Sequence, residues 1–246
     1  MLTTVKAAPS RLQALVHDST RILRTIERDH APAAFASSFG AEDMVLLDLI
    51  ATRTPSIRVL TLDTGRLPAA TLELMARARE RYAIPITVVT PDRHAVEDYV
   101  QRHGIDGFYD GIEQRRACCH VRKVQPLARA LHGQRAWITG LRREQSDNRA
   151  QLAVQELDAV HGIPKFNPLV EWTTIDVWAY IRQHDIPYNA LHDRGYPSIG
   201  CEPCTRAIRP GEPLRAGRWW WESQSQKECG LHVVPIRVAS TAGAAQ

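Results

Sequence analysis

Cysteine is scarce in this chain of 246 residues, with five in all, and no apolar run reaches the roughly 18 residues that a membrane-spanning helix needs. The stretch from Met1 to Arg11 lacks the apolar centre of a secretory signal peptide. No block of about five or six like charges occurs, so the net charge of +4 and the isoelectric point near 8.9 favour a small anionic substrate over a nucleic-acid surface. We therefore expect a cytoplasmic protein with neither a membrane nor a nucleic-acid partner.

What the composition does contain is typical of a globular protein, with 44% hydrophobic and 24% charged residues. The length fits one domain, and we find neither an internal repeat nor a linker that would divide it. We expect a single domain over 1–246, made of an N-terminal helical packing segment at 1–30, a core at 31–222 and a tail at 223–246. From Ala239 onward the tail is rich in small residues, and we predict that it is mobile.

Apolar segments of strand length alternate with helical segments through the first part of the chain. The predicted strands are 33–36, 57–62, 84–89 and 136–139, and the predicted helices between them are 41–51, 68–82 and 94–103. Such alternation predicts an α/β fold with a mainly parallel sheet and helices on both faces. Further on, 163–169 is predicted to be irregular, and Thr173 or Thr174 to cap a helix that ends near His184.

Two short turns follow predicted strands, Ser37–Gly40 after the first and Asp63–Gly65 after the second. In a parallel sheet, ligands bind beyond the carboxyl ends of the strands. A turn that opens a helix also leaves backbone N–H groups free to bind an anion. Both turns are therefore candidate ligand-binding loops, with a plain strand-to-helix connection as the alternative for the first.

The five cysteines form two pairs and one single residue. Cys118 and Cys119 are adjacent among basic residues, Cys201 and Cys204 form a Cys-x-x-Cys pair, and Cys229 lies alone. An odd count in a chain without a secretion signal argues against a disulfide framework and for metal binding or catalysis. Zinc ligands usually lie about two to four residues apart within each half of a site, whereas an iron–sulfur cluster takes one thiolate per iron, so that neighbouring residues can reach different corners. A cluster is the favoured interpretation, and zinc and uninvolved thiols are the alternatives.

With these motifs the chain resembles the assimilatory sulfonucleotide reductases, and among them the adenylylsulfate (APS) reductases that carry a 4Fe-4S cluster. The resemblance runs from about Pro32 to His232 and rests on the cysteine pairs and on the sequence Glu-Cys-Gly-Leu-His at 228–232. It implies an adenine nucleotide alpha-hydrolase-like (PP-loop) fold. It also implies that Cys229 attacks the sulfur of APS, giving AMP and an S-sulfocysteine that thioredoxin or glutaredoxin resolves to sulfite. The residues implied to bind the cluster are Cys118, Cys119, Cys201 and Cys204.

The first turn is similar to the loop Ser-Gly-Gly-x-Asp-Ser of related ATP-cleaving enzymes but departs from it. Phe39 replaces the first Gly, Glu42 the Asp, and Asp43 the final Ser. These departures predict a loop that binds a nucleotide anion without cleaving ATP.

APS is negatively charged at its phosphate and its sulfate, so thiolate attack needs cationic partners. The resemblance places Lys123, Arg215 and Arg218 against the sulfonucleotide, and Arg142 and Arg149 less closely. Lys123 lies five residues after Cys118, a spacing that would put its ammonium between cluster and sulfate. The predicted substrate-binding residues are Ser37, Ser38, Phe39, Gly40, Leu62, Lys123, Gly140, Arg142, Arg149, Arg215 and Arg218.

Three other interpretations are weighed against this one. A reductase of 3′-phospho-APS (PAPS) is the close alternative, and the paired cysteines favour APS. A tRNA-thiolating enzyme would keep the intact ATP-cleaving loop and a broader basic surface, and a zinc-binding module would not explain the motif around Cys229. His232 is a candidate base or a structural histidine, and assembly into a homo-oligomer is left open.

Overall fold

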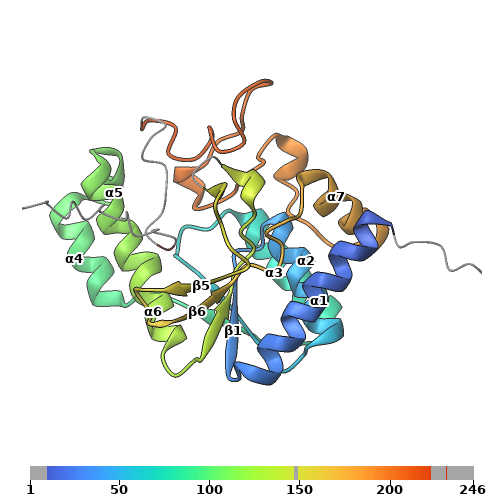
Figure 1. Cartoon of the computed structure of the whole chain (residues 1–246). Coiled ribbons are helices and arrows are strands. Elements are labelled where there is room, and N and C mark those ends of the chain that lie inside the picture. Colours follow the sequence, from blue (N-terminus) through green and yellow to red (C-terminus); the bar gives the residue numbers. More distant parts are fainter. Residues whose placement is uncertain (1–9, 147–148, 223–230, 232–246) are drawn as a thin grey trace, which may run out of the picture.

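The computed structural model describes residues 10–146, 149–222 and 231, and Figure 1 shows their arrangement. The helices are α1 Arg11–Asp29, α2 Ala41–Arg53, α3 Ala69–Tyr82, α4 Arg93–His103, α5 Ile112–Cys119, α6 Gln125–Leu131 and α7 Thr174–Gln183. The strands are β1 Ala33–Ser37, β2 Arg58–Leu62, β3 Ile86–Val89, β4 Ala136–Ile138, β5 Gln155–Asp158 and β6 Ile163–Phe166. None of the described helices is long and apolar enough to cross a membrane.

The strands form one sheet in the order β3-β2-β1-β4-β6-β5. All neighbours are parallel except β5 and β6, which confirms the prediction of a mainly parallel sheet. The prediction of an irregular segment at 163–169 was wrong, because Ile163–Phe166 is β6. Pro164 is compatible with a strand here because only Lys165 and Phe166 pair with β4, so the missing N–H of Pro164 is not needed.

Helices cover both faces of the sheet, as the alternating pattern predicts (Figure 1). On one face, α1, α2, α3 and α7 pack on β1, β2 and β4 around residues such as Leu23, Val45 and Ile181. On the other face, α6 brings Leu127 and Leu131 against the remaining side of the strands. The sheet is therefore buried on both sides, and its carboxyl ends are left for ligands.

The predicted N-terminal packing helix is α1, which begins at Arg11. Its N-cap Ser10 accepts a hydrogen bond from the backbone N–H of Gln13, and the Gln13 side chain bonds back to Ser10 in a capping box. Leu23 and Ile26 are fully buried against the core. The helix therefore has a packing role, as expected.

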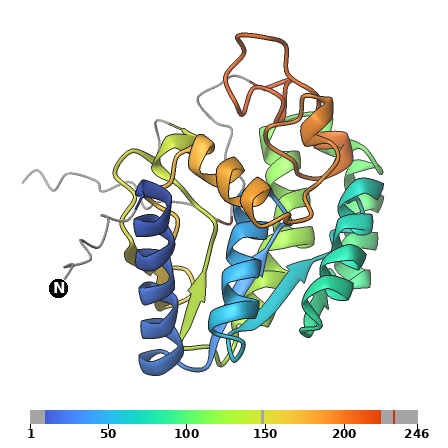
Figure 2. The same ribbon diagram turned by 90° about the vertical axis from the view of Figure 1, so that its right-hand side faces the viewer.

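The segment after the last sheet strand crosses over the carboxyl ends of the strands, as the orange ribbon of Figure 2 shows. Among its described residues, the helical elements are α7 and short 3₁₀ turns, of which Glu202–Cys204 carries the second cysteine pair. The first pair ends α5, and one wider π-helical turn at His120–Val124 joins α5 to α6. Such turns often occur at functional sites. Pro126 in α6 has no N–H to donate to the preceding turn, which fits the widening.

Candidate active site at the carboxyl ends of the strands

A cavity of about 240 Å³ lies at the carboxyl ends of β1, β2 and β4. Its walls come from the turns after these strands, from Lys123 after α5, and from 197–201 and 214–219 in the crossing segment. Leu231 also lines the cavity and packs against the apolar cluster that contains Leu62 and Trp137. Segments that are distant in sequence therefore build one concave site, in the position where α/β sheets bind ligands.

Ten of the eleven predicted substrate-binding residues line this cavity. The exception is Phe39, whose side chain is 1% exposed and packs in the main core. Its φ of 59° turns the chain sharply, so that the loop on either side faces the cavity while the ring points into the core. Sequence reasoning did not find Gln145, His192 and Gly200, which also line the cavity and lie in loops without a recognisable motif.

The turn after β1 is closed by its own acidic residue. The backbone N–H and the hydroxyl of Ser38 both donate to Oδ2 of Asp43, at 2.6 and 2.7 Å. Burial raises the pKa of Asp43 to about 6, although the two hydrogen bonds from Ser38 oppose this. The aspartate thus occupies donors that an ATP-cleaving loop would offer to phosphate.

Gly140, directly after β4, approaches the same turn closely. A Cβ at this position would lie 2.3 Å from Oδ1 of Asp43 and 3.1 Å from Cβ of Glu42. Only glycine allows the end of β4 to pass this close to the start of α2. The backbone of Gly140 is therefore exposed to the cavity, as its predicted role requires.

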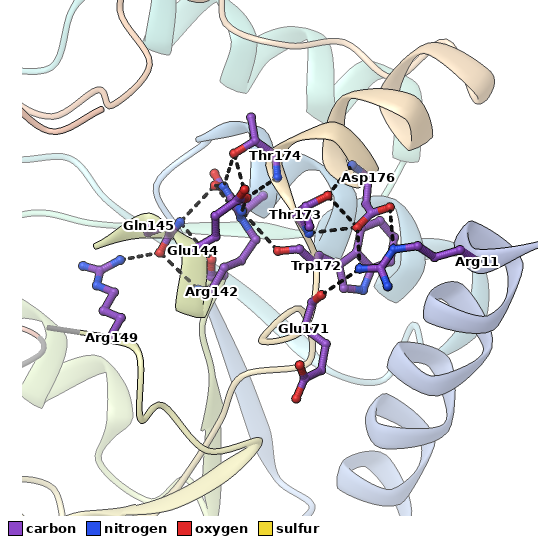
Figure 3. A network of polar contacts seen from close by, with 12 residues as sticks. Arg11, Arg142, Glu144, Gln145, Arg149, Glu171, Trp172, Thr173, Thr174 and Asp176 are labelled. Atoms are coloured by element: carbon purple, nitrogen blue, oxygen red, sulfur yellow. Dashed lines mark hydrogen bonds and ion pairs between the residues drawn. The ribbon is translucent and has the colours of Figure 1, made fainter. Parts of the chain in front are cut away.

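Arg142 is the centre of a buried polar network (Figure 3). Its guanidinium donates to Glu42 at 2.7 and 2.9 Å, to Glu144 at 2.9 Å and to the carbonyl of Trp172 at 3.1 Å. Burial alone would raise the pKa of Glu42, but the charge of Arg142 and hydrogen bonds hold it below its usual value. Arg142 lines the cavity, yet its donors are engaged by the protein, so its geometry is that of a residue that fixes the wall.

A second, adjoining cavity holds all four paired cysteines. Cys118 and Cys119 reach it from the end of α5, and Cys201 and Cys204 from the crossing segment. All four are buried and have free thiols. The other lining residues are basic or apolar, namely Arg66, Phe108, Arg115, Arg122, Lys123 and Pro203.

The charges around these thiols suit an anionic group. Burial raises the pKa of Cys204 to about 12, whereas Lys123, the hydroxyl of Thr64 and Arg218 outweigh burial at Cys201 and lower its pKa. The Thr64 hydroxyl lies 3.2 Å from Sγ of Cys201. Among the described residues, no group of three or more His, Cys, Asp or Glu side chains is arranged to hold a single metal ion. The structure thus brings the four cysteines that the sequence pairs to one small cavity of about 10 Å³ with basic and apolar walls.

Lys123 and Cys201 line both cavities and thus form their common wall. Arg218 lies beside them, with Nη1 donating to Ser198 and to the carbonyl of Ile199, both at 3.2 Å. Its guanidinium carbon is 4.7 Å from the centre of the Trp219 ring. Gly200 permits this packing, because a Cβ there would lie 2.3 Å from Nη2 of Arg218.

Cys229, His232 and the rest of the predicted tail, apart from Leu231, lie outside the described residues. Lys123, Arg215 and Arg218, the cationic residues that the resemblance sets against the sulfonucleotide, are among the described residues and line the cavity.

Comparison with solved structures identifies the class of fold. The FMN adenylyltransferase of Candida glabrata, solved with FMN and an ATP analogue, matches 88% of this chain and 77% of its own with a TM-score of 0.57. Its sequence identity is 16%, so this likeness concerns the fold alone. The chain shares the α/β fold of that protein.

Sequence comparison identifies the family. Residues 32–207 match the phosphoadenosine phosphosulfate reductase domain, and the chain belongs to this family. The adenosine 5′-phosphosulfate reductase of Burkholderia cepacia is 52% identical over 98% of both chains. The phosphoadenylyl-sulfate (PAPS) reductase of Candida auris, solved as a phosphate complex, is 25% identical, with a TM-score of 0.67 over 84% of this chain and all of its own.

Proposed function

We propose that this chain reduces APS to sulfite and AMP in sulfate assimilation, with Cys229 as the nucleophile. The observation that carries this proposal is the common wall of Lys123 and Cys201 between the cavity at the carboxyl ends of the strands and the cavity with four thiols. The relative from Burkholderia cepacia, named for this substrate, supports it.

The chain's own residues supply binding and charge. Leu62 and Gly140, which line the cavity, are the proposed backbone contacts of the adenine and the ribose, and Lys123, Arg215 and Arg218, which line it too, are the proposed partners of the phosphosulfate. The Cys229 thiolate attacks the sulfur of the sulfate, the S–O bond to the phosphate breaks, and AMP leaves with the electron pair. Because the attack brings negative charge to an anion, the cations and the orientation of the sulfate provide most of the rate enhancement.

The position of Leu231 supports Cys229 as the nucleophile. Leu231 belongs to the sequence Glu-Cys-Gly-Leu-His at 228–232 that contains Cys229, and it lines the cavity.

The four buried cysteines are proposed to bind a 4Fe-4S cluster. When bound, the cluster supplies negative charge and a rigid link between α5 and the crossing segment, next to Lys123. Lys123 keeps one wall of the substrate cavity cationic, and its ammonium balances charge on the Cys201 side. The two electrons of the reduction come from a dithiol, for which thioredoxin or glutaredoxin is the proposed donor.

APS is preferred to PAPS in this proposal because the relative from Burkholderia cepacia named for APS is 52% identical, whereas the Candida auris enzyme named for PAPS is 25% identical.

The decisive experiment is to mix the purified protein with APS and to locate the adduct by mass spectrometry. We expect one sulfonate on Cys229 and none in Cys229→Ser, and a sulfonate on another residue would overturn the mechanism. Sulfite release with APS and with PAPS, each with reduced thioredoxin, decides the substrate. Metal analysis after anaerobic purification tests the cluster, and zinc without iron or acid-labile sulfide would remove that part of the proposal.

A further inference from the structure

Two large aromatic side chains remain on the surface close to the cysteine cavity. Among the described residues, Tyr109 and Trp220 are the aromatic members of the set of exposed large hydrophobic residues, at 40% and 41% exposure. Their ring centres are 6.1 Å apart, and both rings contact Trp221, at 4.5 and 4.8 Å. Three aromatic rings in mutual contact on a surface form a continuous apolar area.

Ile105 lies four residues before Tyr109 in the chain and is 63% exposed. Its carbonyl accepts a hydrogen bond of 2.6 Å from Arg66, whose guanidinium carbon lies 5.2 Å from the ring centre of Phe108. Phe108 in turn contacts the ring of Tyr109, at 4.5 Å. We call Ile105, Tyr109, Trp220 and Trp221 the aromatic patch.

The aromatic patch is fixed to the wall of the cysteine cavity. The hydroxyl of Tyr109 donates to the carbonyl of Pro203, between Cys201 and Cys204, at 2.8 Å. Trp220 directly follows Trp219, which lines the substrate cavity. The patch therefore lies on the outer side of the elements that build both cavities.

The patch also adjoins the point from which the chain continues towards Cys229. Glu222 follows Trp221 and pairs with Arg115 through two hydrogen bonds, at 2.5 and 2.9 Å. Both side chains are buried, at 3% and 0% exposure, so this point is firmly held. The proposed nucleophile Cys229 follows Glu222 by seven positions in the sequence.

We infer that the aromatic patch is the docking surface of the dithiol protein that regenerates Cys229. This inference rests on the proposed function, since that function leaves a sulfonate on Cys229 that a second molecule must remove. The attacking thiolate forms a bond to Sγ of Cys229, the bond between Sγ and the sulfonate sulfur breaks, and sulfite leaves with the electron pair. The second thiol of the donor then closes a disulfide and returns Cys229 as a thiolate.

Three features argue for this occupant. A protein donor must bring its thiol to Cys229. It therefore has to contact the surface around the residues that flank Cys229 in the chain, which are Glu222 before it and Leu231 after it. Protein interfaces are enriched in Trp and Tyr, and transient redox encounters use small contact areas, usually below about 1,200 Å². The other exposed large apolar residues among those described are aliphatic and lie on other elements: Leu72 on α3, Leu157 and Val160 on or beside β5, Ile175 on α7, and Leu214 in the crossing segment.

The test compares protein and small-molecule donors on the same sulfonated enzyme. Trp220→Ala is expected to raise the KM for reduced thioredoxin about tenfold, because truncation of a large aromatic residue in a protein interface often weakens binding by this factor or more. Sulfonation of Cys229 by APS in a single turnover and sulfite release by dithiothreitol are expected to stay unchanged. Ile105→Asp, a substitution at a more exposed position, is expected to act in the same direction. Ile175→Ala, at 78% exposure on α7, is the control and should leave all three measurements unchanged.

An unchanged KM for thioredoxin in both patch variants would overturn the inference. So would an equal loss with thioredoxin and dithiothreitol, because that result indicates a change in the position of Cys229 and not in docking. Failure of the proposed function looks different, since the unsubstituted enzyme would then form no sulfonate adduct with APS.

Discussion

The buried pair of Arg115 and Glu222 gives the sharpest stability prediction. The pair joins α5, which ends in Cys118 and Cys119, to the last described residue before 223–230. The side chains are 0% and 3% exposed, and the carboxylate accepts both hydrogen bonds of the guanidinium. The guanidinium carbon also lies 4.6 Å from the centre of the Trp219 ring, so Arg115 cannot turn into water without losing that contact.

Glu222→Gln removes the negative charge and leaves the guanidinium buried. Breaking a buried pair by removing one partner costs about 3–5 kcal/mol, and we take the lower end because Arg115 keeps its ring contact and other interactions. For a chain of this size, about 3 kcal/mol lowers Tm by roughly 6–12 °C. The measurement is thermal unfolding of the anaerobically purified protein, with iron content determined on the same samples.

The matched control is Glu212→Gln, which breaks the pair of Arg206 and Glu212. That pair is also bidentate, at 2.8 and 2.9 Å, but its side chains are 35% and 29% exposed. Because both partners stay in contact with water, a much smaller shift is expected. The double variant Arg115→Met with Glu222→Leu should regain part of the lost stability, since it leaves no buried charge. Equal Tm shifts in Glu222→Gln and Glu212→Gln would refute the reasoning.

Three further predictions concern the substrate cavity. Lys123→Met should slow the sulfonation of Cys229 about 100-fold, because it removes a positive charge beside the reacting anion, and Lys123→Arg should recover part of the rate. Single-turnover quench experiments measure this rate. A rate in Lys123→Met equal to that of the unsubstituted enzyme would contradict the assigned role. Gly140→Ala should weaken AMP binding at least about tenfold in calorimetry, with an unchanged circular dichroism spectrum, because its Cβ would meet Asp43 at 2.3 Å; binding at the original affinity would argue against a tight approach. Burial raises the pKa of Asp43 to about 6, so the folded state favours the protonated carboxyl, and the stability that this protonation contributes is lost as the pH rises towards 6. In urea unfolding, the free energy of unfolding of Asp43→Asn should therefore fall less than that of the unsubstituted protein when the pH is raised from about 4 to 6. Parallel pH profiles of the two proteins would contradict this.

Much of the fold could be predicted because its cause is local. Apolar runs such as those of β1 and β2 alternate with helical periods along the chain, and a parallel sheet covered on both faces follows from that order alone. The N-terminal helix could also be predicted from its periodic apolar residues. By contrast, β5 has the sequence Gln-Glu-Leu-Asp and borders solvent, so its strand conformation depends on pairing with β6 and not on its own residues.

The candidate site divides in the same way. Residue types and motif spacing were enough to single out the four paired cysteines, Lys123 and the turn at Ser37–Gly40. The sequence did not indicate that Arg142 donates to Glu42 and Glu144, because Glu42 lies on α2, 100 positions away in the chain, and Glu144 reaches Arg142 through the 3₁₀ turn that follows it. The sequence also did not predict that the Phe39 ring packs in the core, because this position depends on the positive φ of Phe39 in the folded backbone.

The sequence by itself indicated most of the strands and helices and the candidate side chains for the chemistry, because periodicity, turn residues and thiols act over short stretches of chain. Only the tertiary structure decided which of these side chains meet. The common wall of Lys123 and Cys201, the close approach of Gly140 to Asp43 and the burial of Arg115 with Glu222 all join segments that are far apart along the chain. Such contacts depend on how the packed sheet orients its loops, and no local pattern of residues encodes that orientation.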